Sequence, residues 1–93
     1  MSDIPLPVPY ERTFDALYGL VVDEQSDDRV TAHVTVEDHH KQPMGLVHGG
    51  VLASIAESIT SMATATVVMR DGFMAQGLSN QTSFLRPVLG SRI

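Results

Sequence analysis

Residues 48–68 read HGGVLASIAESITSMATATVV and form the longest weakly polar stretch of the chain. Apolar side chains recur in this stretch at the i, i+3, i+4 spacing of a helix, so we expect a helix from about Gly49 to Val68. Glu57 is the only Asp, Glu, Lys or Arg in it. A helix that is apolar or small on all sides is a buried helix, and the acid with its neighbouring hydroxyls favours a core helix over a membrane span. The stretch predicts a small domain built around one long helix.

The composition of the chain agrees with one small domain. The chain has 93 residues, of which 43% are hydrophobic, enough for a packed core and too many for a disordered chain. The net charge of −5 argues against nucleic-acid binding, which needs a basic face. The absence of cysteine excludes disulfides, thiolate nucleophiles and cysteine zinc sites. The N-terminus has no basic region followed by an apolar run, so we expect no secretory signal and a cytoplasmic protein.

Shorter elements flank the long helix. Alternating prolines predict an extended arm over residues 1–16, which leaves residues 17–93 as the domain. Two β-prone runs on either side of a polar turn predict a hairpin, because the second run alternates apolar and polar residues. The two strands of this hairpin are expected at 20–23 and 29–36. The other expected elements are a short helix at 10–17, a polar loop at 37–47 and a third strand at 76–85.

This order of elements predicts an α+β fold. Three strands are too few to cover a long helix that is apolar on most sides. We therefore expect either that partner chains complete the sheet or that further strands follow residue 93; in the second case the 93-residue domain is incomplete at its C-terminus.

The start of the helix is a candidate binding site. Gly49 and Gly50 let a ligand approach the backbone closely. The first N–H groups of a helix have no partner within the helix and lie at the positive end of its dipole, so they can bind a carbonyl oxygen that becomes anionic. The alternative is a tight turn that passes under another strand.

Glu57 is the candidate nucleophile or general base. A buried carboxylate is costly unless it is paired, hydrogen-bonded or used in chemistry. The alternative is a structural acid satisfied by the hydroxyl of Ser54, Ser58 or Ser61. Glu57 lies eight positions after Gly49, which is about 12 Å along a helix and more than a thioester or ester group spans. If both act, the glycine of one subunit must meet the glutamate of another, as in two antiparallel helices across a two-fold axis.

Two further polar residues are candidates for the same site, because of their positions relative to the helix start and to Glu57. Gln42, in the loop before the helix, carries an amide that can hydrogen-bond a substrate carbonyl or hold the carboxylate; the alternative is a solvated loop residue. Ser61 lies one turn after Glu57 on the same face and can orient a water or the carboxylate. Its alternative is a hydrogen bond to the backbone four residues earlier.

The histidines do not predict a metal site. His39, His40 and His48 share one loop, but adjacent histidines point in different directions and no acidic or cysteine ligand has a recognised spacing. We expect no bound metal, and we expect His48 to order the helix start or to contact substrate.

The sequence from Gln42 to Gly50, QPMGLVHGG, followed by VLASIAES, resembles the hotdog-fold acyl-CoA thioesterases, in particular the phenylacetate-pathway and 4-hydroxybenzoyl-CoA type. Residues 77–88 are similar to the next strand of that family, and the resemblance spans roughly residues 17–93. It implies an antiparallel sheet wrapped around the helix, and homodimers or homotetramers with active sites at the interface.

The resemblance also implies roles for individual residues. Glu57 attacks the thioester carbonyl or activates water, while the Gly49 backbone N–H polarises that carbonyl. Gln42 completes the catalytic set. The expected substrate contacts are His48, Gly50 and Ser61. Coenzyme A is then part of the substrate and no separate cofactor is expected.

The length departs from the family, whose domain has about two more strands. An alternative is therefore a non-catalytic or truncated hotdog domain that only binds ligand or associates. The dehydratases of the same fold are a further class, but their His and Asp dyad pattern is not seen. The acyl specificity does not follow from the sequence, and Arg86 and Arg92 are the only candidate nucleotide contacts.

Overall fold

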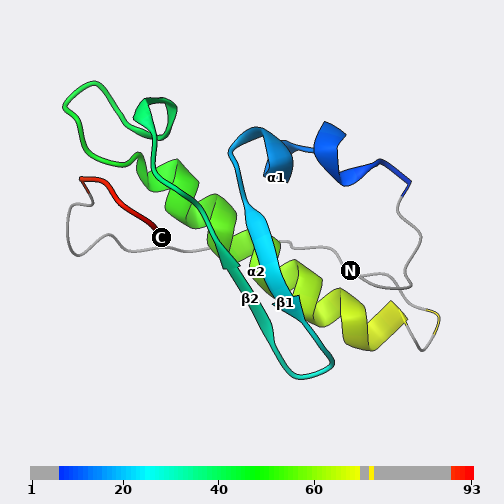
Figure 1. Ribbon diagram of the computed structural model, residues 1–93. Coiled ribbons are helices and arrows are strands. Elements are labelled where there is room, and N and C mark those ends of the chain that lie inside the picture. Colours follow the sequence, from blue (N-terminus) through cyan, green and yellow to red (C-terminus); the bar gives the residue numbers. More distant parts are fainter. Residues whose placement is uncertain (1–6, 70–71, 73–88) are drawn as a thin grey trace.

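The computed structural model describes residues 7–69, 72 and 89–93. One long helix, α2 (Gly49–Val68), is crossed by a two-stranded hairpin made of β1 (Val21–Gln25) and β2 (Val30–His33) (Figure 1). The elements that remain are short: η1 (Tyr10–Arg12), α1 (Phe14–Leu17) and η2 (Asp38–His40). The predicted third strand at 76–85, and Arg86, lie outside the described residues.

Helix α2 spans the residues that its periodicity predicts. The side chain of His48 caps its first turn, and the Met69 backbone N–H donates to the Ala65 carbonyl at its end. No residue of α2 is fully buried within the described part of the chain. By length and composition alone α2 would also suit a membrane span, a test that the core helix of a soluble protein passes equally well.

The predicted hairpin is confirmed, with strands shifted by a few residues. Strand β1 pairs antiparallel with β2, and Val21 lies opposite His33. The register shifts between Val22 and Glu24, where a bulge places two residues opposite one. In the turn, the Ser26 backbone N–H donates to the Arg29 carbonyl at 2.8 Å.

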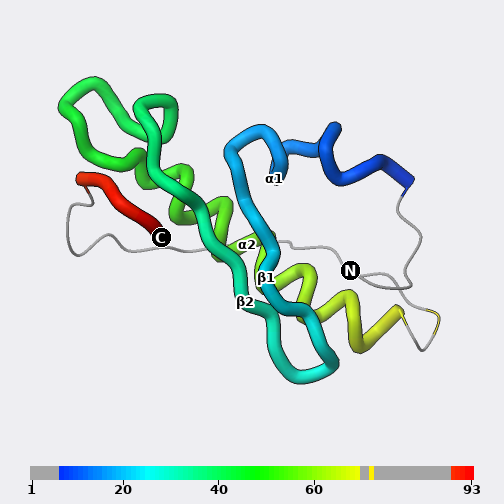
Figure 2. Tube along the Cα trace, viewed as in Figure 1, coloured from blue at the N-terminus to red at the C-terminus, as the bar shows by residue number. Residues whose placement is uncertain are grey.

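The last residues of the chain pair with the segment that directly follows β2. Val34 and Ile93 exchange two backbone hydrogen bonds of 2.9 Å, and the Val36 N–H donates to the Ser91 carbonyl at 2.8 Å. Residues 34–36, which the sequence assigned to a strand, are therefore paired, but with the last residues of the chain instead of with β1. Figure 2 follows the chain from β2 through the loop to the start of α2.

A small apolar core joins the hairpin to α2. Tyr18, Leu20 and Val34 are buried, with Leu20 only 2% and Val34 0% exposed. Ile55 and Met62 of α2 are half-buried and pack against them. Burial of one aliphatic side chain contributes about 1.5–3 kcal/mol, so these few residues hold the two layers together.

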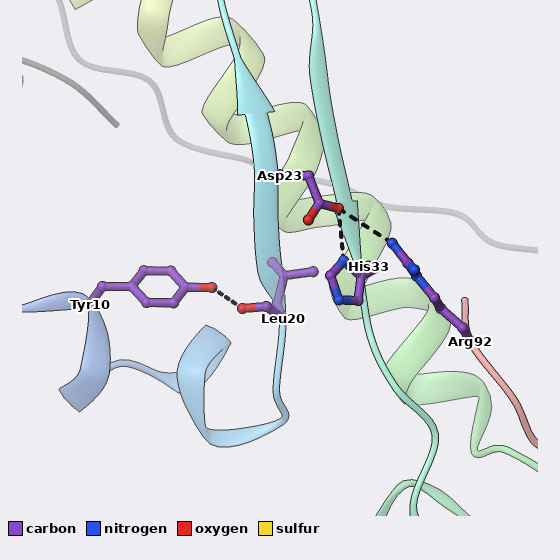
Figure 3. A network of polar contacts seen from close by, with 5 residues as sticks. All are labelled: Tyr10, Leu20, Asp23, His33 and Arg92. Carbon is purple, nitrogen blue, oxygen red and sulfur yellow. Dashed lines mark hydrogen bonds and ion pairs between the residues drawn. The ribbon is translucent and has the colours of Figure 1, made fainter.

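Polar contacts on the outer side of the hairpin tie three segments together (Figure 3). Asp23 of β1 lies 2.7 Å from the His33 imidazole of β2 and 4.0 Å from the Arg92 guanidinium. The Tyr10 hydroxyl donates to the Leu20 carbonyl and fixes η1 at the start of the hairpin. Because Asp23 and Arg92 are largely exposed, their ion pair contributes little stability.

His40 is a buried polar residue, 2% exposed, that joins the loop to α1. Its Nδ1 accepts the Glu37 backbone N–H at 2.9 Å, so the ring proton lies on Nε2. That Nε2–H donates to the Tyr18 carbonyl at 2.5 Å. The His40 carbonyl in turn accepts the backbone N–H of His48 at 2.8 Å. The His40 side chain thus positions α1, and its backbone carbonyl holds the segment that enters α2.

The two adjacent histidines provide a matched test of this arrangement. We expect His40→Ala to lower the free energy of unfolding by about 1–3 kcal/mol, because the Tyr18 carbonyl loses its partner in a buried site. His39→Ala should change it by less than about 0.5 kcal/mol, since the His39 side chain is 57% exposed. Urea unfolding followed by circular dichroism measures both values. Equal losses in the two variants would contradict the anchoring role of His40.

Candidate active site

The N-terminus of α2 is capped by the side chain of His48. The Nδ1 atom of His48 accepts the Gly50 backbone N–H at 2.8 Å, and the Val51 N–H donates to the His48 carbonyl at 3.0 Å. The predicted role of His48 in ordering the helix start agrees with this contact. The Gly50 amide is directed to His48, whereas Gly49 forms the first residue of the helix.

Position 50 requires glycine for a steric reason that is not evident from the sequence. A Cβ atom on Gly50 would lie 2.9 Å from His48 Nδ1 and 3.2 Å from its Cε1. Real Cβ atoms essentially never lie within 3.0 Å of another heavy atom, so any larger residue would displace the imidazole. Gly50 is therefore needed for the His48 cap, independently of any contact with substrate.

Glu57 lies in the middle of α2 and is half-buried. The Ser61 hydroxyl donates to Glu57 Oε1 at 3.0 Å, so the predicted contact between these side chains is present. Within the described residues the other two candidate hydroxyls are used elsewhere: Ser54 donates to the Gly50 carbonyl at 2.7 Å, and Ser58 donates to Asp15 Oδ1 at 2.6 Å. A single hydroxyl thus orients the carboxylate from the following turn.

The helix start and Glu57 do not meet within one chain. Both belong to one continuous helix, and the eight positions from Gly49 to Glu57 correspond to about 12 Å of rise. The Gly49 amide and the Glu57 carboxylate of the same chain therefore cannot contact one carbonyl group.

Gln42 shapes the loop that leads to the helix. Its backbone N–H donates to the Leu46 carbonyl at 2.8 Å, and its carbonyl accepts the Gly45 N–H at 2.9 Å. Its side-chain Oε1 accepts the Met44 backbone N–H. Gly45 has a φ of +91°, a conformation that side chains rarely adopt, so this tight loop favours glycine there. The amide oxygen of Gln42 is occupied in the loop, and its Nε2 group is the part that suits donation to a ligand.

A cavity of about 420 Å³ lies beside the helix start, between α1 and the first turns of α2. Of the predicted site residues, His48 and Gly50 line it, whereas Gly49, Glu57, Gln42 and Ser61 do not. The contribution of α1 does not follow from the sequence, because nothing local in that segment indicates that it faces α2. The lining residues are Phe14, Leu17, Tyr18, His39, His40, Lys41, His48, Gly50, Val51 and Ser54.

A polar cluster fixes α1 on α2. Besides the bond from Ser58 to Asp15, the Tyr18 hydroxyl lies 3.3 Å from Ser58 Oγ and 3.4 Å from Asp15 Oδ1. Burial, more than the nearby Asp15 charge, raises the pKa of Tyr18 to about 12. Tyr18 therefore stays protonated at neutral pH and acts as a hydrogen-bond donor, not as a base.

The described residues contain no group of three or more histidines and carboxylates placed to hold a metal ion. The chemistry that these residues can supply is that of a carboxylate and a helix N-terminus. A carboxylate can attack an acyl carbon or activate water, and the helix start can stabilise an oxyanion.

Comparisons with known proteins agree with the fold. Residues 44–92 match the thioesterase superfamily. The chain is 34% identical over 88 residues to a Mycobacterium tuberculosis protein named "Putative esterase Rv1847", and 32% identical over 77 residues to "Putative esterase PA1618" of Pseudomonas aeruginosa. These alignments cover 92% and 83% of the chain but only 63% and 53% of the relatives.

Solved structures of the same two proteins resemble the chain. The Mycobacterium tuberculosis esterase structure has a TM-score of 0.80 at 34% identity and covers 85% of the chain and 64% of its own. A crystal structure of a mutant thioesterase PA1618 from Pseudomonas aeruginosa also has a TM-score of 0.80, at 29% identity. This match covers 88% of the chain and 59% of the Pseudomonas protein chain. The predicted α+β hotdog fold is thereby confirmed, although the subtype within it is not distinguished. By its matching profile and its fold, this chain belongs to the thioesterase superfamily.

Proposed function

We propose that this chain is the core of an enzyme that hydrolyses acyl-CoA thioesters, with an aromatic or medium-chain acyl group. The observation that carries the proposal is Glu57, the only carboxylate of α2, half-buried and oriented by the Ser61 hydroxyl at 3.0 Å. Membership of the thioesterase superfamily supports the reaction class. The chain spans less than two thirds of the length of these relatives.

In the proposed reaction the thioester carbonyl oxygen binds the Gly49 N–H at the positive end of α2, which stabilises the developing oxyanion. Glu57 then acts in one of two ways. As a nucleophile it forms a carbon–oxygen bond while the carbon–sulfur bond breaks, and water hydrolyses the resulting anhydride. As a general base it removes a proton from water, whose oxygen attacks the same carbon; the carbon–sulfur bond then breaks, and the proton held by Glu57 passes to the leaving thiolate. Both routes release a carboxylic acid and the coenzyme A thiol.

The site requires two copies of the chain. Since about 12 Å separates Gly49 from Glu57 on one helix, the oxyanion contact and the carboxylate must come from different subunits. We therefore propose a homodimer or homotetramer in which antiparallel α2 helices form two equal sites, with Gln42 and His48 beside the thioester. Coenzyme A enters only as part of the substrate. We further propose a cytoplasmic protein with neither a nucleic-acid nor a membrane partner.

A non-catalytic domain is the second candidate function. The Gly50 N–H and the Gln42 amide oxygen are both engaged within the chain, which reduces the number of groups left to bind substrate. Such a domain would associate or bind acyl-CoA without hydrolysing it.

Thiol release from a panel of acyl-CoA esters separates these two candidates. We expect the wild type to release thiol, and Glu57→Gln and Glu57→Ala to be about 10²–10⁴-fold slower, the range typical for loss of a general base. Glu24→Gln is the matched control, because Glu24 is an exposed glutamate of the hairpin whose carboxylate pairs with the exposed Arg29 at 3.0 Å. Thiol release that persists in Glu57→Ala would rule out the catalytic role of Glu57.

Mixing two inactive variants tests the shared site. Mixed dimers of Gln42→Ala and Glu57→Ala chains contain one site with both changes and one intact site, so activity should return to about half of the wild-type level. If each site lay within one chain, every site would keep one lesion. Mixed dimers proven by differential tagging that stay inactive would therefore exclude the shared site.

Ser61 should act as a positioning residue. We expect Ser61→Ala to lower kcat by about 10–100-fold with little change in KM, since a hydrogen bond to a charged group is lost. Thr64→Ala serves as the control, because the Thr64 hydroxyl donates to the Thr60 backbone carbonyl at 2.9 Å and lies on the exposed side of the helix. Steady-state kinetics at a fixed pH compares the two variants. An equal effect of both changes would indicate that Ser61 only stabilises the helix.

A further inference from the structure

Helix α1 presents an apolar surface to the cavity beside the start of α2. Phe14 and Leu17 occupy the i and i+3 positions of this short helix, and both line the cavity. They are 62% and 77% exposed, although other apolar residues of the same segment, Tyr18 and Leu20, are buried. Two large apolar side chains that face the same hollow are suited to contact an apolar ligand.

This surface is held in a fixed position. The Asp15 carboxylate accepts the Ser58 hydroxyl of α2 at 2.6 Å, a contact between residues 43 positions apart in the sequence. At the other end of α1 the Tyr18 carbonyl accepts His40 Nε2–H at 2.5 Å. These two bonds attach both ends of α1 to the rest of the domain, so its exposed face is a rigid wall and not a loose arm.

The opposite side of the cavity is the helix start. His48 and Gly50 line it together with Val51. Under the proposed function the thioester carbonyl lies at this helix start, and its carbon carries two substituents. One is the hydrocarbon part of the acyl group, and the other is the sulfur of the long, charged coenzyme A. The apolar wall formed by Phe14 and Leu17 suits the acyl group, because a phosphate placed against these two side chains would be desolvated at a cost; Lys41, elsewhere in the lining, is the cation that a phosphate would approach instead.

The dimensions of the cavity indicate the size of that acyl group. A cavity of about 150 Å³ is sufficient for benzene, so about 420 Å³ accepts a ring-sized acyl group with space remaining. The Phe14 and Tyr18 rings lie 5.0 Å apart at an angle of 56°. Tilted pairs of this kind can extend to a third ring, which packs edge to face.

We propose that Phe14 and Leu17 determine substrate specificity by forming the wall of a pocket for an apolar acyl group about the size of a phenyl ring. This assignment rests on the proposed function, because that function places the thioester carbonyl at the start of α2. The acyl pocket and Glu57 then belong to different subunits of one site.

Substitutions that change the size of the wall test the assignment by hydrolysis. We expect Phe14→Ala and Leu17→Ala to lower kcat/KM for benzoyl-CoA and phenylacetyl-CoA by about 10–200-fold, with less than about 3-fold change for acetyl-CoA. Leu17→Trp should reject the aromatic substrates and retain acetyl-CoA, because it reduces the cavity. Val8→Ala is the matched control, since Val8 is an exposed apolar residue of the same segment that does not line the cavity. Equal changes for all three substrates would overturn the assignment.

A binding measurement separates this assignment from the proposed function. Calorimetry compares the non-hydrolysable thioethers phenacyl-CoA and acetonyl-CoA, first on the wild-type chain and then on Phe14→Ala. We expect the wild type to prefer phenacyl-CoA by at least about 10-fold and Phe14→Ala to lose that preference. Such a result without any thiol release would reject hydrolysis and retain the pocket. If the wild type released thiol from aromatic substrates but bound phenacyl-CoA no more tightly than acetonyl-CoA, the pocket would be rejected and hydrolysis retained.

Discussion

The apolar surface of α2 has to be covered, and the contacts that cover it arrange the rest of the described chain. Leu20 and Val34 of the hairpin segment pack on Ile55 and Met62 of the helix. This contact fixes the hairpin across α2 (Figure 1), and the residues on either side of it then follow: α1 before Leu20, and the loop with His40 after Val34. Since folding leaves a net stability of only a few kcal/mol, a core of this size depends strongly on each of these side chains.

The parts of the fold that could be predicted are those set by local patterns. The bounds of α2 follow from an uninterrupted periodicity between a glycine pair and a turn, and the hairpin follows from two β-prone runs around a polar turn. The predicted short helix at 10–17 is divided into η1 and α1 at Thr13, whose extended backbone interrupts the helix and whose hydroxyl caps the second one. The interruption depends on the geometry of one residue, which the spacing of the apolar residues does not indicate.

The polar contacts that build the site region were less predictable because they join distant parts of the sequence. The Ser58–Asp15 bond spans 43 positions and the His40–Tyr18 bond spans 22. Local spacing correctly placed Ser61 on the face of Glu57, since the two residues are one turn apart. It could not choose between the three serines near Glu57; Ser58 is used to anchor α1, and Ser54 bonds to its own helix backbone.

The stiffness of α2 relates the cavity to the chemistry. One helix cannot bend by the amount needed to bring Glu57 back to its own N-terminus, whereas a single two-fold rotation brings each N-terminus to the Glu57 of the other helix. The cavity beside α1 belongs to the helix start, because His48 and Gly50 line it and Glu57 does not. In such a dimer, one chain would recognise the acyl group and polarise its carbonyl, while the other would supply the carboxylate. Substitutions in α1 would then alter substrate preference without displacing Glu57 of the same chain, and hydrolysis would require association of two chains.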